Sequence, residues 1–491
     1  MARKDRIFPA KNLLVLLTVL ALTLASCSNS ATVKDNGDTA ESQHQSEKIE
    51  ENTRIPTGLE PQKFDGYEFR FLNFEQFWNN MQLTVEEETA DTLNDAIYKR
   101  NMTVMEQLNI ELAETFPGDP AGQIRNIVAS GDSSFDAGYV YASAIGSLVG
   151  KSTQKYVYDF AVDVPYVDLE KPWWTQSANA SLSLANRQYF AVNDISLSYF
   201  DSVMPLVMNM RIAADHNLGN VYELVRKGGW TMDVMGQMMR TVSGDLNGDG
   251  DYTLKEDRFG MFGMSEEYVA LVIAGGGNII KKDQNDIPYF AVGEESFINA
   301  FAKAIEILNV EGVFANFRLP KYKVDGGDLS TFTEGRALFF SDVLFWISGM
   351  RSMEDDFAIL PRAKLTEQQK NYYSYCHESS ALLCIPITAD AERSGYIIET
   401  LAAESHYTVI PAYYEVVLSQ KFARDEDSIE MLDIIFASRV SDLGCVFNWS
   451  NIYTSLRQMG EQGNADIASL AARVQKSIEK SIADLLPDDI G

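Results

Sequence analysis

Strand-like and helix-like patterns of apolar residues follow one another from about residue 67. "YEFRFL" at 67–72 is a strand candidate, and 92–108 carries apolar residues at helical spacing behind a possible capping box of Thr92 and Asp95. "NIELAETF", "AGQIRNIVASGD" and "FDAGYVYA" continue the series as strand, helix and strand. A β-α-β-α-β series predicts parallel strands joined by right-handed helical crossovers.

Four aromatic residues stand where ligands of such a sheet are expected. Ligands of open parallel sheets sit beyond the carboxyl ends of the strands. Phe74 and Trp78 follow the first predicted strand, and Tyr139 and Tyr141 end the third. We therefore expect these side chains near one mouth of the sheet.

The middle of the chain is rich in helices, and its last third holds four predicted helices. "GGWTMDVMGQMMRTV" has Thr231 as its expected N-cap and a methionine-rich stripe, which is more typical of core packing than of a recognition surface. "GRALFFSDVLFW" is predicted to be an apolar strand that runs into Trp346, and "DFAILPRAK" a short strand that ends at Pro361. The four late helices are predicted near 390–404, 411–422, 425–438 and 463–486.

The first residues have the layout of an export signal. A basic start is followed by an apolar run from Leu13 to Leu24 and by "LASC", and twelve apolar-dominated residues are too few for a permanent membrane helix. The tetrad resembles a bacterial lipoprotein signal, in which Cys27 is lipidated and becomes the new amino terminus; the alternative is an ordinary secretion signal with an incidental cysteine. Residues 1–26 are then a signal peptide, and the polar stretch 27–58 a disordered tether.

Composition indicates a large, acidic globular protein. With 491 residues, 46% of them hydrophobic, the chain can bury a core large enough for more than one compact unit. Its formal net charge of −29 at pH 7 repels nucleic acid and anionic lipid surfaces, so neither is an expected partner. Beyond Cys27 only Cys376, Cys384 and Cys445 remain, without a C-x-x-C pair, and we expect buried free thiols.

Several blocks together resemble an extracellular solute-binding protein of an ABC importer, in the carbohydrate-type family 1 group found as lipoproteins in Gram-positive bacteria. The blocks span roughly residues 60 to 450 in order. They are "ADTLNDAIYKRNMTVMEQLNI", "PYVDLEKPWW", "NRQYFAVNDISLSYF", "VRKGGWTMDVM", "FTEGRALFF…FWISGMRSMEDDFAILPRAK" and "ARDEDSIEMLDIIF". Each block is weak alone, and their order carries the resemblance.

The resemblance implies an α/β, two-lobed periplasmic-binding-protein-like (type II) fold with a hinge and an interlobe cleft. Closure of such a cleft is a hinge motion driven by ligand contacts to both lobes. The first crossing between the lobes is expected near 192–200, and others around 365–380 and 411–420. The expected lobes are 59–196 plus about 378–412 for the first, and 197–377 plus about 413–491 for the second.

Sugar binding in such a cleft needs two kinds of side chain. Pyranose rings stack their C–H faces on aromatic rings, and their hydroxyls need paired donors and acceptors. For any one aromatic residue, core packing is the competing explanation; Trp346 and Asp194 are favoured because the family places an aromatic residue or a carboxylate there. The candidates are Phe74, Trp78, Tyr141, Trp173, Trp174, Tyr199, Phe200 and Trp346, with Asn193, Asp194, Asp201 and Glu378 as polar partners.

The stretch "DLNGDGDYTLKE" at 245–256 matches the calcium-loop pattern D-x-[DN]-x-[DN]-G-x5-E. The metal ligands would be Asp245, Asn247, Asp249, the backbone carbonyl of Asp251, and Glu256. Calcium sensors pair two such loops, whereas this loop is single and is followed by the strand-like "DRFGMFG". We therefore expect a structural calcium clip in the second lobe; the alternative is an acidic turn that binds no metal.

These observations predict a lipid-anchored, monomeric binding protein at the extracellular face of the cell membrane. It would capture a carbohydrate, preferably an oligosaccharide, by cleft closure and deliver it to ABC permease subunits, with no organic cofactor. Catalysis has no visible machinery, since "GSLVGKS" misses the phosphate-loop spacing and no G-x-S-x-G or H-E-x-x-H occurs. The alternatives are a sensor that feeds a membrane kinase and, less favoured, a surface glycoside hydrolase whose carboxylates lie among 70 acids.

Overall fold

The strands predicted near the start of the chain form one sheet in the computed structural model. β1 (Tyr67–Leu72) pairs in parallel with β2 (Ile110–Thr115) and β3 (Ala137–Tyr141). β12 (Ala381–Cys384) joins the other edge of β3 in the antiparallel direction, which gives the order β12-β3-β1-β2. The parallel series predicted from the sequence is confirmed, and a strand from far along the chain completes the sheet.

The structure describes residues 54–75, 82–150, 155–324, 328–350, 352–418 and 426–486. Every element below belongs to the unit Pro56–Gly491. In the ranges just given, no helix combines the length and the apolar character that crossing a membrane requires. The predicted lipidation site Cys27 and the candidate Trp78 lie outside the described residues.

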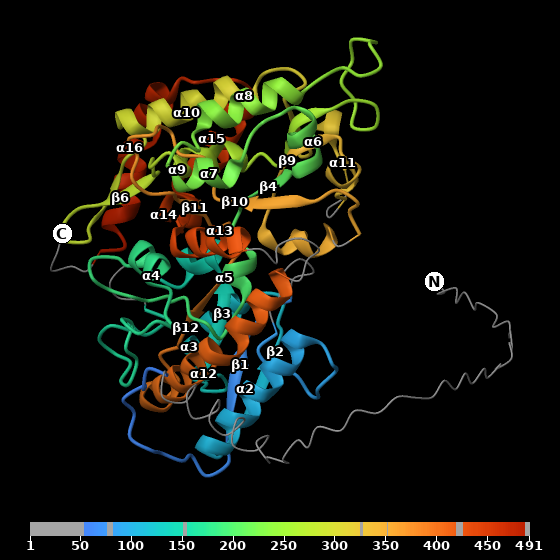
Figure 1. The fold of residues 1–491 in the computed structure, drawn as a ribbon. Coiled ribbons are helices and arrows are strands. Elements are labelled where there is room, and N and C mark those ends of the chain that lie inside the picture. The colour runs from blue at the N-terminus through green and yellow to red at the C-terminus, as the bar shows by residue number, and fades with distance from the viewer. Residues whose placement is uncertain are drawn as a thin grey trace, which may run out of the picture. The chain divides into compact units, whose positions relative to one another are not determined.

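Helix α2 (Thr92–Leu108) packs against α12 (Ala391–Leu418) on the first sheet (Figure 1). The α2 cap is Asp91, whose carboxylate accepts from the N–H groups of Leu93 and Asn94. The cap therefore lies one residue before the expected capping box. The separate helices expected near 390–404 and 411–422 are wrong, because α12 continues through Pro411. Packing on α2 carries the helix past the backbone hydrogen bond that a proline removes.

A second sheet has the order β10-β4-β9-β5-β8. Its strands are β4 (Leu206–Asn209), β5 (Phe259–Gly263), β8 (Phe314–Asn316), β9 (Ala337–Ser341) and β10 (Phe357–Leu360). β5 lies parallel to β8 and β9, whereas β4 runs antiparallel to β9 and β10. Every residue of these five strands is buried, as expected of a sheet covered on both faces.

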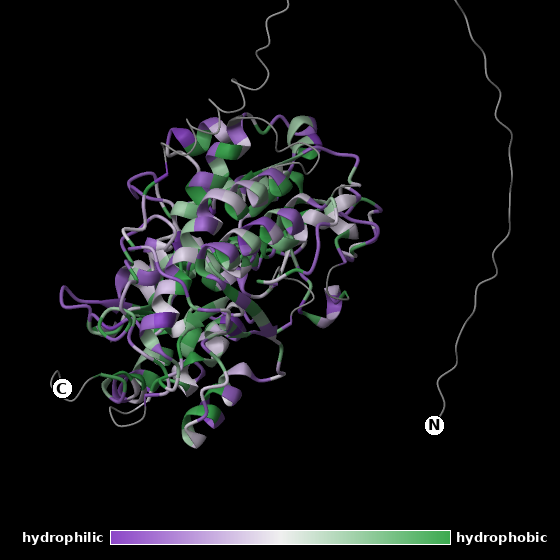
Figure 2. Ribbon diagram, turned by 90° about the horizontal axis from the view of Figure 1, so that it is seen from below, coloured by the Kyte–Doolittle hydropathy of each residue, from purple (hydrophilic) through white to green (hydrophobic). Residues whose placement is uncertain are grey.

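Helices cover the second sheet, and they form the upper part of Figure 1. The methionine stripe of α8 is buried at Met235, Met238 and Met239, so these residues are core, as predicted. Figure 2 shows hydrophilic residues on many of the peripheral helices and loops. The main helices of this part are α8 (Met232–Val242), α9 (Glu267–Ala274), α10 (Glu295–Leu308), α13 (Glu426–Ala437), α15 (Ile452–Glu461) and α16 (Ile467–Ala483).

We call the first sheet with its helices lobe 1 and the second sheet with its helices lobe 2. Within the described residues, the chain passes between them through α5 (Ser198–Asp201) and through the segment 376–381. The residue boundaries expected for the lobes stay a prediction, although α12 runs through the one expected at about 412. The shorter elements are α3 (Pro120–Ser130), η1 (Ala142–Ser147), α4 (Gln176–Leu182), α6 (Met210–Asp215), α7 (Val221–Arg226), β6 (Ile280–Lys282), β7 (Pro288–Phe290), η2 (Pro320–Tyr322), α11 (Ser330–Thr333), η3 (Leu344–Met350), β11 (Ser374–Tyr375), β13 (Arg439–Val440), α14 (Leu443–Phe447) and η4 (Trp449–Asn451).

Candidate functional site

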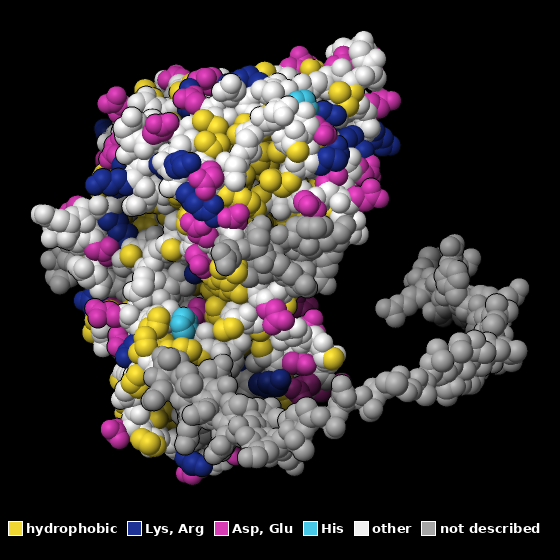
Figure 3. Space-filling view, in the orientation of Figure 1, with side chains coloured by type: hydrophobic (Ala, Val, Ile, Leu, Met, Phe, Trp, Pro, Cys, Tyr) yellow, Lys and Arg dark blue, Asp and Glu magenta, His cyan; other side chains and the backbone are white. Residues whose placement is uncertain are grey.

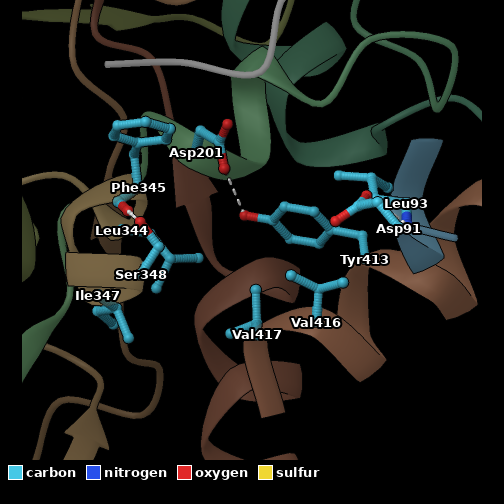
Figure 4. Close-up of a pocket in the computed structure, with 10 residues that line it drawn as sticks. All are labelled: Asp91, Leu93, Asp201, Leu344, Phe345, Ile347, Ser348, Tyr413, Val416 and Val417. Atoms are coloured by element: carbon cyan, nitrogen blue, oxygen red, sulfur yellow. Dashed lines mark hydrogen bonds between the residues drawn. The ribbon is translucent and has the colours of Figure 1, made fainter. Parts of the chain in front are cut away.

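A cavity of about 180 Å³ lies where α2, α5, η3 and α12 meet (Figure 4). Lobe 1 contributes the start of α2 and the end of α12, lobe 2 contributes η3, and the crossing helix α5 contributes Asp201. The cavity therefore lies between the two lobes. The residues that line it are Asp91, Leu93, Asp201, Leu344, Phe345, Ile347, Ser348, Tyr413, Val416 and Val417.

Asp201 and Tyr413 are the central polar pair of this first cavity. The Tyr413 hydroxyl donates to Oδ1 of Asp201 over 2.7 Å, as the dashed line in Figure 4 marks. Burial, together with the Asp201 carboxylate, raises the pKa of Tyr413 well above its usual value, so the phenol stays a neutral donor. The cavity thus combines aromatic rings, which can pack on C–H groups, with carboxylate oxygens, which can accept hydrogen bonds from hydroxyls.

A second cavity of about 530 Å³ lies between α3 and η1 of lobe 1 and, in lobe 2, the end of α14, the start of η4 and the residues after α16. Phe447 and Trp449 form its aromatic side, with stacked rings whose centroids lie 4.5 Å apart at 11°. On the lobe 1 side, Arg125 donates to the Ser147 hydroxyl over 2.5 Å. The lining residues are Asp119, Ala121, Arg125, Ser143, Ala144, Gly146, Ser147, Phe447, Trp449 and Leu485.

An unusual backbone presents Trp449 to the second cavity. Its neighbours Asn448, Ser450 and Asn451 have φ angles of 43°, 53° and 56°, in the left-handed region that residues other than glycine rarely adopt. The Asn448 side chain holds this conformation, because its oxygen accepts from the N–H groups of Tyr453 and Thr454. Strained backbone held by its surroundings is typical of functional sites.

Charged groups gather beyond the carboxyl ends of β5, β8 and β9. Glu266 is buried and accepts from Arg457 Nη1, and Arg318 Nε lies 3.9 Å from its Oε2. Within the described part of the chain, Glu266 Oε2 has no hydrogen-bond donor. Burial raises the pKa of the nearby Asp342 to about 7; the N–H of Val343 opposes this rise and Glu266 adds to it. This edge of lobe 2 therefore offers polar groups that a ligand can satisfy.

Glu378 connects this polar edge with lobe 1. Its carboxylate accepts from the Tyr375 hydroxyl over 2.8 Å, and its backbone carbonyl accepts from the N–H of Ser143, which lines the second cavity. Burial raises the pKa of Glu378, but His377 and hydrogen bonds from Tyr375 and Tyr453 outweigh burial and hold that pKa below its usual value. Glu378, a predicted site residue, thus lies beside the cavity as a carboxylate.

Two of the predicted tryptophans are core residues. Trp173 and Trp174 are 0% and 1% exposed, and both indole N–H groups donate to the Glu399 carboxylate, over 2.8 and 2.9 Å. In this conformation both indoles belong to the core, and their role in ligand binding stays a prediction. Phe74 is also buried and packs on the half-buried Tyr141, with ring centroids 3.8 Å apart.

The predicted residues at 193–200 make contacts that stabilise the first crossing. Asn193 accepts from the Tyr139 hydroxyl, Asp194 pairs with His406 Nδ1 at 2.7 Å, and the hydroxyls of Tyr199 and Ser441 lie 2.8 Å apart. All of these predicted residues, with Phe200, are at most 5% exposed. The predicted Trp346 is half-buried and packs edge-on against Phe345, which lines the first cavity. Of the predicted residues, Asp201 lines a cavity directly.

The predicted calcium ligands cap their own loop. The Asp245 carboxylate accepts from the N–H groups of Gly248 and Gly250, over 2.7 and 2.8 Å, and Lys321 pairs with Asp251 at 2.8 Å. Gly250 has a φ of 82°, which provides the expected sharp turn. No three His, Cys, Asp or Glu side chains among the described residues are grouped to hold a metal. Calcium binding by this loop stays a prediction.

No family model matches the sequence, and no curated protein matches it. Among solved structures, the chain is similar to a cyclic alpha-maltosyl-1,6-maltose binding protein from Arthrobacter globiformis, with a TM-score of 0.55, 10% identity, and coverage of 85% of this chain and 99% of that one. The fold is that of a two-lobed solute-binding protein. The GacH receptor of Streptomyces glaucescens GLA.O, solved unliganded and with acarbose, has a TM-score of 0.52, 9% identity, and coverage of 85% and 99%. An ABC substrate-binding protein from Listeria monocytogenes in complex with cycloalternan has a TM-score of 0.50, 10% identity, and coverage of 86% and 98%.

Proposed function

We propose that this chain is an extracellular solute-binding protein that captures a carbohydrate between its lobes and delivers it to an ABC importer. One observation carries the proposal: a two-lobed binding-protein fold has cavities between its lobes that combine aromatic rings with carboxylates. The neighbours are named as binding proteins or as a receptor, and two were solved with acarbose or cycloalternan. The proposal is accordingly of a binding protein, not an enzyme.

The two cavities would contribute different interactions with a sugar. In the second, the stacked pair Phe447 and Trp449 offers an aromatic face for the C–H surface of a pyranose. In the first, Asp201 and Ser348 offer oxygen atoms to sugar hydroxyls. The second cavity, about 530 Å³, is within the range of small-molecule pockets, and an oligosaccharide is the proposed ligand.

Closure follows from the position of the cavities. Because both lobes contribute lining residues, a bound sugar makes its full set of contacts only when the lobes are together. A ligand shifts an equilibrium by as much as its affinities for the two states differ. The contacts of the sugar with both lobes would therefore drive closure of the cleft.

The remaining parts of the proposal come from the sequence. Lipidation of Cys27 would anchor the protein outside the cell, with 27–58 as its tether, and permease subunits would receive the sugar. The loop 245–256 would hold a structural calcium ion, and the protein would act as a monomer.

A glycan screen tests the proposal. Thermal-shift measurements across mono- and oligosaccharides identify a ligand, and calorimetry then compares the intact protein with Trp449→Ala. A sugar stacked on Trp449 should lose about 2 kcal/mol or more of binding free energy in the variant, as for a buried aromatic anchor. Tyr166→Ala, which removes an exposed aromatic residue that lines neither cavity, is the matched control and should bind normally. A panel in which no saccharide raises the melting temperature would argue against the proposal.

A further inference from the structure

A hairpin of lobe 2 reaches a turn of lobe 1. The hairpin consists of β6 and β7, and its tip contacts the segment that follows α4. The backbone N–H of Ala185 donates to the Asp286 carbonyl over 2.9 Å, and the N–H of Asn186 donates to the Asp286 carboxylate over 2.8 Å. The Ser183 hydroxyl donates to the other carboxylate oxygen over 2.9 Å. One residue of the hairpin thus binds three groups of the turn.

Lys282 adds a second anchor on the same hairpin. Its ammonium donates to the carbonyl of Ala180, in the last turn of α4, over 2.7 Å and to the Ser183 hydroxyl over 2.8 Å. A cation at this helix end is favourable because the last carbonyls of a helix carry partial negative charge. Lys282 also lies 3.0 Å from Asp286, and the two side chains are only 16% and 18% exposed. Solvent screens this pair less than an open surface ion pair.

The contacting parts hold their shape through their own bonds. In lobe 1, Leu184 and Arg187 exchange backbone hydrogen bonds around Ala185 and Asn186, which have φ angles of 54° and 60°. This tight turn directs its two central N–H groups outward, toward Asp286. In the hairpin, the Asp283 carboxylate accepts from the N–H groups of Asn285 and Ile287. Preorganised partners lose little conformational entropy when they meet.

Each side of the contact is firmly attached to its own lobe. Beyond the turn, Ala191 pairs with Leu383 of β12, in the sheet of lobe 1. At the root of the hairpin, the N–H of Ile279 donates to Asp442 over 2.6 Å, and α16 packs on β7. The same helix holds η4, where the Ser450 and Ser477 hydroxyls lie 2.9 Å apart. The contact therefore joins the lobes at a place outside the crossing segments. Through α16, which packs on both β7 and η4, it is also connected to the backbone that carries Trp449.

We propose that the β6–β7 hairpin is a strap that holds the two lobes together and restrains opening of the ligand-free cleft. The inference rests on the proposed function in one respect, that the lobes move on a hinge. Opening separates Asp286 and Lys282 from the turn of lobe 1, and their hydrogen bonds must then be replaced by water. The strap shifts the equilibrium between open and closed lobes toward the closed state. It therefore reduces the binding free energy that a ligand must supply to close the cleft.

Pulsed electron spin resonance on the full chain without any ligand tests the strap. Spin-labelled amino acids at Glu106 on α2 and Gln237 on α8, both exposed, report the distance between the lobes. Asp286→Ala and, separately, Lys282→Met should shift this distance distribution to longer values and broaden it. Gln284→Ala, an exposed change on the same turn, is the matched control and should leave the distribution unchanged.

Hydrogen exchange provides a second readout. In Asp286→Ala the amide of Asn186 loses its carboxylate acceptor and should exchange roughly tenfold faster, as expected when a typical hydrogen bond is lost. If Asp286→Ala lacks a cooperative melt, Lys282→Met decides by the same distance measurement. Folded variants that keep the distances of the intact protein would overturn the strap. Failure of the proposed function would appear separately, as absence of saccharide binding to the intact chain.

Discussion

At the scale of single residues, the burial of Glu399 makes the stability of the fold depend on pH. It is 0% exposed, and the indoles of Trp173 and Trp174 donate to it. Burial raises its pKa to about 7, although the two indole hydrogen bonds oppose this rise. Because the pKa in the folded protein lies above the ordinary value of 4.5, folding takes up a proton between these two values. The stabilising contribution is complete below about pH 4.5 and is lost as pH rises through about 7.

Glu399→Gln should remove this part of the pH dependence while keeping an acceptor for one of the two indoles, because a glutamine amide has a single oxygen. Urea unfolding at several pH values would measure it. The intact protein should lose on the order of 3 kcal/mol of unfolding free energy from this group between pH 4.5 and 7, a loss that the variant lacks. Parallel stability curves for the two proteins would contradict the assignment.

Arg362 is the second residue whose role can be measured. It and Glu267 form an ion pair in which both side chains are 0% exposed, and Arg362 also donates to the Met204 carbonyl and the Ser341 hydroxyl, over 2.8 Å each. Arg362→Met leaves the Glu267 charge buried without its partner, so we expect a loss of about 3–5 kcal/mol in unfolding free energy by chemical denaturation. Arg211→Met, which breaks a partly exposed pair with Asp355, is the control and should cost less than about 1 kcal/mol.

At the scale of elements, the loop 245–256 makes the calcium prediction testable. If the loop binds calcium, Glu256→Gln should lower the melting temperature in calcium but not in chelator, because a metal stabilises only the state that binds it. Asp251→Ala is the matched control. The metal would bind the backbone carbonyl at this position, which the substitution keeps, and the side chain that is removed pairs with Lys321. A calcium-independent shift in Glu256→Gln would show that the loop is only an acidic turn.

The elements that the sequence predicts well are those with strong local patterns. Strands at 67–72 and 137–141 and the helix at 92–108 follow from apolar periodicity, and the structure has each of them. The break expected before 411–422 fails because the packing of α12 on α2 overrides Pro411. Local patterns also miss β12, which joins the first sheet from far along the chain.

The candidate site was harder to predict than the fold for a physical reason. Periodicity shows that an aromatic residue is buried, but not whether it is buried by its own lobe or faces the other lobe. Trp173 and Trp174 are of the first kind, whereas Phe447 and Trp449 line a cavity. The one local signal for Trp449 is its run of Asn and Ser neighbours, residues that tolerate left-handed backbone better than most.

At the scale of the whole molecule, the proposed capture of a sugar depends on two lobes and the contacts between them. Acidic and basic side chains are interspersed over the face shown in Figure 3. With a net charge of −29, the chain is expected to avoid nucleic acid, and recognition of a neutral sugar would rest on the groups of the cleft. In the proposed function, contacts with the sugar would therefore drive closure of the cleft.

Small-angle X-ray scattering tests closure most directly. Profiles of the full chain are recorded with and without a saturating saccharide chosen by its thermal shift. We expect a smaller radius of gyration with the saccharide, because contacts to both lobes would draw the lobes together. A saccharide that binds with measurable affinity but leaves the scattering profile unchanged would contradict closure around a sugar.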